Sequence, residues 1–251
     1  MKFVSKTDIG RVRTENQDRV WVGYIKDDVI MAIVCDGMGG EKAGGVASEM
    51  TMDIFRDRMK NGFRDDIDGN SLRNLMITSI EAANTLVYEK ADNPNMQGMG
   101  TTCVAVVIQG QRAYIINVGD SRAYCISRDG GINQITKDHT MVRMLVEQGK
   151  ISEDEVQEHP QRNYITRAVG AREDISADYF EIDISGSDKI LLCSDGLSGY
   201  LDEEKILEIV SRNDINAASD ALVNEANERG GYDNITVVLI SNEKNGSDLN
   251  G

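Results

Sequence analysis

The close spacing of apolar, β-branched runs limits the fold of this sequence more than any other feature. Gly110 alone separates the runs 101–109 and 111–118. Two aspartates, which favour turns, separate 19–26 from 29–35. Further strands are predicted at 122–127, 189–194 and 234–241. Strands joined by such short connections pair antiparallel, because a parallel crossover needs about a dozen residues.

Helical periodicity occupies the segments between these groups of strands. The predicted helices are 42–60, 71–91, 139–149, 203–212 and 216–229. In the first of them, apolar residues recur three or four positions apart from Ala43 to Ile54 and form one stripe. Ser71 and Asp202 are predicted N-caps. Strands in groups and helices in pairs indicate the α+β class, with antiparallel sheet covered by helices.

The sequence predicts one large domain rather than two small ones. Its 251 residues are 40% hydrophobic, enough for a sizeable core, and it has only two prolines and no linker-like stretch. We expect this domain to span 1–241. Within it, 141–172 combines a short helix with polar loop and is expected to be a surface excursion. The tail 242–251 lacks an apolar anchor and is expected to fray.

The chain is strongly acidic and shows no targeting or membrane signal. Its formal net charge of −15 is expected to repel nucleic acid and anionic membrane surfaces. The N-terminus has no apolar segment of the signal-peptide kind, and no run approaches the ~18 apolar residues of a membrane span. The four cysteines form no C-x-x-C pair and lie in or beside apolar runs. Buried thiols and a cytoplasmic location are therefore expected.

Four aspartates lie where apolar runs end or begin. Asp36, Asp120 and Asp195 follow such runs, and Asp233 precedes one. Any one of them alone is explained as a turn residue or a helix cap. Strand ends in packed layers share an edge, however, so these side chains can converge. Several neighbouring carboxylates cannot all remain ionised unaided, and a divalent cation removes the conflict.

The donor set indicates a hard metal ion. All of the donors are oxygen atoms, which favours Mg²⁺ or Mn²⁺, with Ca²⁺ as a further option. Calcium usually takes its ligands from one compact loop, which the sequence lacks. Isolated aspartates leave coordination positions for water, which suits phosphoryl chemistry at two ions about 3.5–4 Å apart. Arg13, five residues before Asp18, can bind phosphate with two parallel hydrogen bonds; an ordinary surface arginine is the alternative.

Eight short motifs follow one another from about Lys2 to Ile240. They are TDIGRVRTENQD, VCDGMGG, GTTCVAVVI, VGDSRAY, KDHT, NYITRAVG, CSDGL and GGYDNITVVLI. Each is weak alone, but all eight in this order resemble the bacterial branch of the metal-dependent serine/threonine protein phosphatases, the type 2C or PPM family. The resemblance implies a four-layer α-β-β-α sandwich, with two antiparallel sheets between pairs of helices. It also implies that 141–172 is a mobile flap near the active site.

The resemblance assigns catalytic roles to two positions. Arg13 matches the family's phosphate-binding arginine. Asp36 matches the aspartate that bridges two core metal ions, with the backbone carbonyl of Gly37 as a neighbouring ligand. The implied reaction is single-step hydrolysis of phosphoserine or phosphothreonine on proteins, by water activated between the two ions. The implied cofactors are two core Mn²⁺ or Mg²⁺ ions, with a third that is held more weakly.

Further metal ligands follow in the same way. Asp18 matches an acid that reaches the metals largely through water. Asp195 and Asp233 match the carboxylates of one core ion, and Asp120, together with Asp195, matches the weaker third site. The implied partners are phosphorylated proteins, among them a serine/threonine kinase, and the expected oligomeric state is a monomer.

The sequence departs from the family pattern in two places. Gln17 stands where many relatives carry a glutamate, which removes one charge beside Asp18. Met38 stands where eukaryotic relatives carry a histidine that is the proposed general acid, so this role is unfilled at its usual position. His139 is the other histidine with a motif around it, and the segment Asp138–Thr140 is alternatively a cap of the next helix.

Other functions are open to test from the sequence. A catalytically silent phosphatase-like protein that binds phosphopeptides is the main alternative. A nucleotide site at GMGGEKAGG is disfavoured, because the glycines lack the order of a P-loop. Serine-hydrolase chemistry is disfavoured by the absence of a G-x-S-x-G elbow. Arg162, Arg167 and Arg172 are candidates for binding an acidic substrate segment, with surface charge or an internal ion pair as the alternative.

Overall fold

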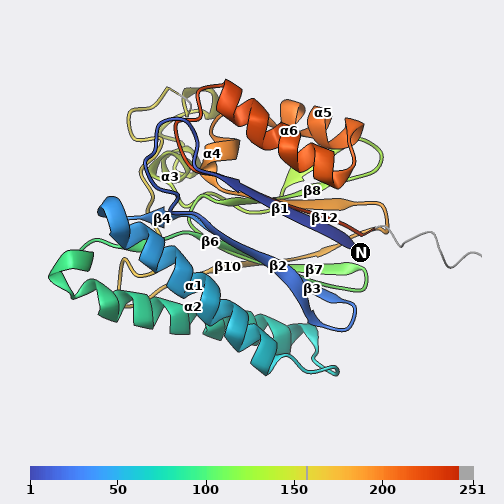
Figure 1. Ribbon diagram of the computed structural model, residues 1–251, viewed down its shortest axis with the longest axis horizontal. Helices are drawn as coiled ribbons and strands as arrows, with labels where there is room; N and C mark the ends of the chain where they lie inside the picture. Colours follow the sequence, from blue (N-terminus) through green and yellow to red (C-terminus); the bar gives the residue numbers. More distant parts are fainter. Residues whose placement is uncertain (157, 243–251) are drawn as a thin grey trace, which may run out of the picture.

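The computed structural model describes residues 1–156 and 158–242 and has four layers (Figure 1). Two five-stranded sheets lie face to face, and a pair of helices covers the outer face of each. The first sheet has the order β1 (Lys2–Asp8), β12 (Ile235–Ser241), β11 (Lys189–Cys193), β8 (Arg122–Ile126) and β9 (Ile132–Gln134). The second has the order β10 (Asp178–Asp183), β7 (Arg112–Val118), β6 (Cys103–Gln109), β3 (Val29–Cys35) and β2 (Arg19–Lys26). The expected α-β-β-α sandwich is therefore confirmed.

Every strand pairing within the two sheets is antiparallel, as the short connections predict. In the β6–β7 hairpin, Gln109 pairs with Arg112, so Gly110 and Gln111 form the turn. Gly110 has a φ of 62° there. Asp28, in the turn between β2 and β3, also adopts a positive φ of 60°, which aspartate tolerates better than most residues.

The helices cover the sheets in two pairs. They are α1 (Gly40–Gly62) and α2 (Gly69–Ala91) on one side, and α5 (Glu203–Arg212) and α6 (Ile215–Glu228) on the other. Asp202 caps α5, as predicted, by accepting a hydrogen bond from the Lys205 amide. The prediction that Ser71 caps α2 was wrong. Asp68 is the cap, and it accepts the Ser71 backbone amide at 2.7 Å.

Alternation along the central strands explains why their sequences are apolar throughout. Along β3, Met31, Ile33 and Cys35 face the α1–α2 pair. The intervening residues, Ile30 and Val34 among them, face the other sheet. Both faces of the strand are buried, so no polar alternation remains in the sequence.

The outer strands β1, β10 and β9 were not predicted from the sequence. Each lies at an edge of its sheet and has mixed polar and apolar residues, since one face is partly exposed. The small β4–β5 pair (Gly37–Met38 with Gly100–Thr101) was also missed.

The excursion 141–172 contains little regular structure in its described part. It holds α3 (Met141–Glu147), a 3-10 turn at Glu153–Glu155, and a bridge from Ile165 back to Thr140. The helix predicted at 139–149 is thus shorter than expected, and Thr140 caps it. The predicted frayed tail lies outside the described residues except for Asn242.

Candidate metal and phosphate site

Strand register brings Asp18 and Asp36 together. Arg19, the first residue of β2, pairs with Cys35, the last residue of β3. The residues just beyond this pair are Asp18 and Asp36, at the edge of the sheets where β4 and α4 (Asp195–Ser198) begin (Figure 1). Both carboxylates therefore leave the same end of the second sheet.

Strand pairing also determines where the other aspartates lie. Antiparallel pairing of β11 with β12 puts Asp195, two residues past Cys193, beside the start of β12, which Asp233 precedes. Asp120 lies in the short crossing from β7 to β8, which connects the two sheets at this end. Asp120, Asp195 and Asp233 line one cleft. The four strand-end aspartates of the sequence, and Asp18, thus gather at one edge of the sandwich.

Crowding and burial disturb the ionisation of these carboxyl groups. Burial raises the pKa of Asp18 to about 7; the charges of Asp195 and Asp233 add to this, and hydrogen bonds from Thr236 and Ser194 oppose it. Burial, then the charges of Asp18 and Asp195, raise the pKa of Asp36. Burial and neighbouring carboxylates also raise the pKa values of Asp120 and Asp195. Without a cation, the group cannot be fully ionised at neutral pH.

Close packing accounts for the glycine after Asp36 and after Asp195. A Cβ at Gly37 would lie 2.2 Å from the carbonyl oxygen of Gly44. A Cβ at Gly196 would lie 1.9 Å from the carbonyl oxygen of Asn234. A side chain at either position would displace the backbone that carries the adjacent carboxylate.

Arg13 lies at the open side of the cluster. Its Nη2 contacts Asp233 Oδ2 at 2.7 Å, and about half of the side chain remains exposed. Hydrogen bonding to Asp233 raises the pKa of Arg13, so the guanidinium is permanently charged. The arginine is therefore attached to the carboxylate group and still accessible to an anion.

The residues that hold these groups in position were not predicted from the sequence. Asn234 accepts the Gln17 amide and donates to the carbonyls of Ile9 and Glu15, which fixes the loop bearing Arg13. Thr102 accepts the Asp36 amide at 2.9 Å. Ser194 donates to Asp18 Oδ2 at 2.8 Å. Their position next to an aspartate could have indicated two of these residues, because Ser194 and Asn234 directly flank an aspartate within a motif.

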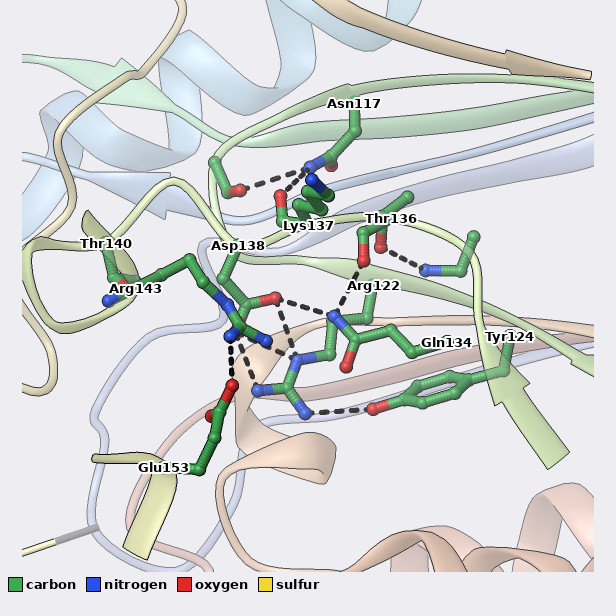
Figure 2. A network of polar contacts seen from close by, with 12 residues as sticks. Asn117, Arg122, Tyr124, Gln134, Thr136, Lys137, Asp138, Thr140, Arg143 and Glu153 are labelled. Atoms are coloured by element: carbon green, nitrogen blue, oxygen red, sulfur yellow. Dashed lines mark hydrogen bonds and ion pairs between the residues drawn. The ribbon is translucent and has the colours of Figure 1, made fainter. Parts of the chain in front are cut away.

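Arg122 and Asp138 form a second charged group in the wall of the same cleft (Figure 2). Arg122 binds the Asp138 carboxylate through Nε and Nη2, at 2.9 and 2.6 Å, and its Nη1 donates to the Tyr124 hydroxyl at 2.9 Å. Gln134 donates to Asp138 at 3.0 Å. The two charges compensate each other close to Asp120. Within the segment Asp138–Thr140, Thr140 rather than Asp138 caps α3.

The arginines predicted to bind substrate lie in two different clefts. Arg162 lines the cleft with Asp195 and Asp233. Arg167 instead binds Asp178 Oδ1 at 2.8 Å and lies in a second cleft, which Met38 and Arg172 also line.

His139 is engaged by protein groups on both ring nitrogens. The amide of Gly119 donates to Nδ1 at 3.1 Å, and Nε2 lies 3.1 Å from Arg167 Nη1 and 3.3 Å from Asp178 Oδ2. Burial lowers the pKa of His139. His139 is thus a buried residue in the wall of the second cleft, with protein groups beside both ring nitrogens.

Comparisons with known proteins identify the family of this chain. The sequence model of the family described as "Protein phosphatase 2C" matches residues 10–239. The chain belongs to the protein phosphatase 2C family. It is 36% identical over 237 residues to the serine/threonine phosphatase stp of Listeria innocua, covering 94% of this chain and 93% of that protein.

Solved structures of phosphatases have the same fold. The serine/threonine phosphatase of S. agalactiae matches with a TM-score of 0.90 and 34% identity, covering 96% of this chain and 98% of that one. The catalytic domain of the serine/threonine phosphatase PstP, solved with two manganese ions, matches with a TM-score of 0.81 and 32% identity over 95% and 96% of the two chains. This protein phosphatase 2C member is thus a metal-dependent serine/threonine protein phosphatase.

The carboxylates fit the ions that this family uses. Among the described residues, one oxygen each of Asp18, Asp120 and Asp195 is buried without a hydrogen-bond partner. No group of three or more acidic, histidine or cysteine side chains in the described residues is arranged to hold an ion unaided. Hard ions that keep several waters and take a backbone carbonyl suit such a set, because few direct carboxylates are needed. The buried oxygens without partners are positions that a cation would satisfy.

No helix in the described part of the chain is both long and apolar enough to cross a membrane.

Proposed function

We propose that Asp36, Asp195 and Asp233 hold two Mn²⁺ or Mg²⁺ ions together with the carbonyl of Gly37. Asp18 contacts these ions through water, and Asp120 with Asp195 forms a weaker third site. The observation that carries the assignment is the convergence of carboxylates from separate strand ends, where a buried oxygen of each of Asp18, Asp120 and Asp195 has no hydrogen-bond partner among the described residues. When bound, such ions lower the pKa of water and offset charge on phosphate.

In this proposal Arg13 binds the phosphate of the substrate. Its charge is permanent, it lies beside Asp233, and it remains accessible to an anion. A guanidinium at this position stabilises charge on the phosphate oxygens during hydrolysis. Met38 has no proton to donate, so either water or another residue protonates the leaving serine or threonine oxygen, or that oxygen leaves with help from the metal ions.

The surrounding protein has supporting roles. Residues 1–241 form one catalytic domain, and 141–172 is a flap beside the active site. Arg162, which lines the cleft, contacts the substrate protein. Arg167 contacts the substrate protein only if the substrate displaces it from its ion pair with Asp178. The substrates are phosphoproteins, and they include a serine/threonine kinase that this monomeric, cytoplasmic enzyme opposes.

The test is hydrolysis of a phosphothreonine peptide with and without Mn²⁺, by the wild type and by Asp36→Ala. We expect activity only with metal, and a fall of several orders of magnitude in kcat for the variant, with an unchanged circular dichroism spectrum. Asp66→Ala, at an exposed aspartate, is the matched control. A folded Asp36→Ala variant with normal turnover would contradict the assignment. Metal-dependent peptide binding without turnover by the wild type would favour the silent alternative.

A further inference from the structure

Two stacked tyrosines adjoin the carboxylates, and the catalytic chemistry makes no use of them. The rings of Tyr200 and Tyr232 have centroids 5.7 Å apart and an interplanar angle of 29°. Tyr232 directly precedes Asp233, and Tyr200 lines the cleft with Asp195 and Asp233. Despite this contact, Tyr232 remains 56% exposed.

The Tyr232 ring is held in place by its surroundings. It packs against Gly230, where a Cβ would lie 2.1 Å from the ring. Gly230 has a φ of 123°, a conformation that other residues rarely adopt. The ring thus lies between Gly230 and Tyr200, with its remaining surface open. An aromatic side chain fixed in advance loses little conformational entropy when it binds a partner.

A second exposed apolar segment adjoins the tyrosine pair (Tyr200 and Tyr232). The loop after β1 lies beside the loop after α6 (Figure 1), and the Arg11 amide donates to the Gly231 carbonyl. Val12 in this loop is 59% exposed and Ile9 is 38% exposed. Both loops therefore carry exposed apolar side chains, and Val12 in the first directly precedes Arg13.

We propose that the tyrosine pair and Val12 bind a large apolar side chain of the substrate, within two residues of the phosphorylated serine or threonine. This rests on the proposed function, which places the phosphate at Arg13. Arg13 is one residue from Val12, and Asp233 is one residue from Tyr232. An extended substrate chain advances about 3.3 Å per residue, so its nearest neighbours pass over these side chains.

The substrate chain is the occupant that the position favours. The apolar surface is continuous with the cleft, because Tyr200 belongs to both. A phosphoprotein bound there must continue past the phosphate on either side, and it covers this surface without further rearrangement. The enzyme is therefore selective for phosphosites with an apolar neighbour.

The test is a set of phosphothreonine peptides in which Phe or Ala occupies each of the four positions within two residues of the phosphothreonine. We expect the wild type to prefer Phe at one or more of them by about 3- to 10-fold in kcat/KM, the worth of an aromatic contact. Tyr232→Ser should abolish the preference, and Tyr232→Phe should keep it. Free O-phospho-L-threonine, which has no flanking residues, is measured in parallel.

Tyr24→Ser is the matched control. Tyr24 is also exposed and also packs on a ring, that of Phe3 at 5.6 Å, but it lies at the far end of β2 from Asp18. This variant should retain the preference. No preference in the wild type at any position, or a preference that survives in Tyr232→Ser, would overturn the proposal, and the wild-type peptide scan decides even if the variant does not fold. If the enzyme with Mn²⁺ hydrolyses neither the peptides nor free phosphothreonine, the proposed function is refuted, and the inference with it.

Discussion

Replacing Asp18 with asparagine should stabilise the metal-free protein, although it alters the proposed metal site. Asp18 is 3% exposed, and one of its oxygens has no hydrogen-bond partner among the described residues. Its other oxygen accepts the Ser194 hydroxyl, which an asparagine oxygen can also accept. Asp18→Asn therefore removes a buried negative charge and keeps the shape of the side chain.

The size of the effect follows from the pKa shift. Burial and the neighbouring aspartates raise the pKa of Asp18 from 3.8 to about 7. Three pH units correspond to about 4 kcal/mol. Because the folded protein holds this proton more tightly than the unfolded chain does, stability is lost as the pH rises from about 4 to about 7. Above pH 7 the full free-energy cost of the buried Asp18 charge lowers the stability of the wild type, and the variant does not have this cost.

The assay is urea unfolding of both proteins in EDTA at pH 4 and pH 8. At pH 8 the variant should be more stable by up to about 4 kcal/mol, or roughly 10 °C in Tm for a chain of this size. At pH 4 most of the difference should disappear. Saturating Mn²⁺ should stabilise the wild type more than the variant, because ligands stabilise the state that binds them. A variant that is equally stable or less stable in EDTA at pH 8 would refute the argument from charge repulsion.

Two further substitutions test the charged groups around the carboxylates. Arg13→Ala should lower kcat/KM for phosphopeptides by about 100-fold, because a preorganised hydrogen-bond donor to the phosphate is lost, and Arg13→Lys should recover part of this loss. Steady-state kinetics at saturating Mn²⁺ measure the effect, and unchanged kinetics would contradict the role of Arg13. Arg122→Leu should destabilise the fold by about 3 kcal/mol, because Asp138 is left without its partner. The double variant with Asp138→Leu should recover part of that loss in thermal unfolding, and no recovery would show that the pair is not the cause.

The sequence predicted the centre of the fold better than its edges. Central strands such as β3 and β6 are buried on both faces, and their continuous apolar runs are visible without knowledge of their neighbours. The edge strands β1 and β10 have one partly exposed face and carry lysine, aspartate and glutamate. They are strands because a neighbour offers hydrogen bonds, and this information is not local.

Some residues of the candidate site could likewise be predicted from the sequence, and others could not. Aspartates at strand ends can be found from the sequence, because their positions relative to apolar runs are local features. The ion pair between Arg122 and Asp138 spans 16 residues and depends on how the segment after β9 returns to the sheet. Arg162 and Arg167 are five residues apart, yet they line different clefts. Spacing alone could not separate them.

The same contrast explains why apolar strands end on aspartates in this protein. The buried strands fix the positions of their last residues, because sheet pairing and two covered faces leave little freedom. Carboxylates such as Asp36 and Asp195 are thereby held close together against their mutual repulsion. A sequence optimised only for stability would not contain this cluster of carboxylates. Natural proteins depart from the sequence patterns that favour stability mainly at functional sites. The raised pKa values, and the buried oxygens without partners among the described residues, are therefore the properties expected of carboxylates that bind a cation.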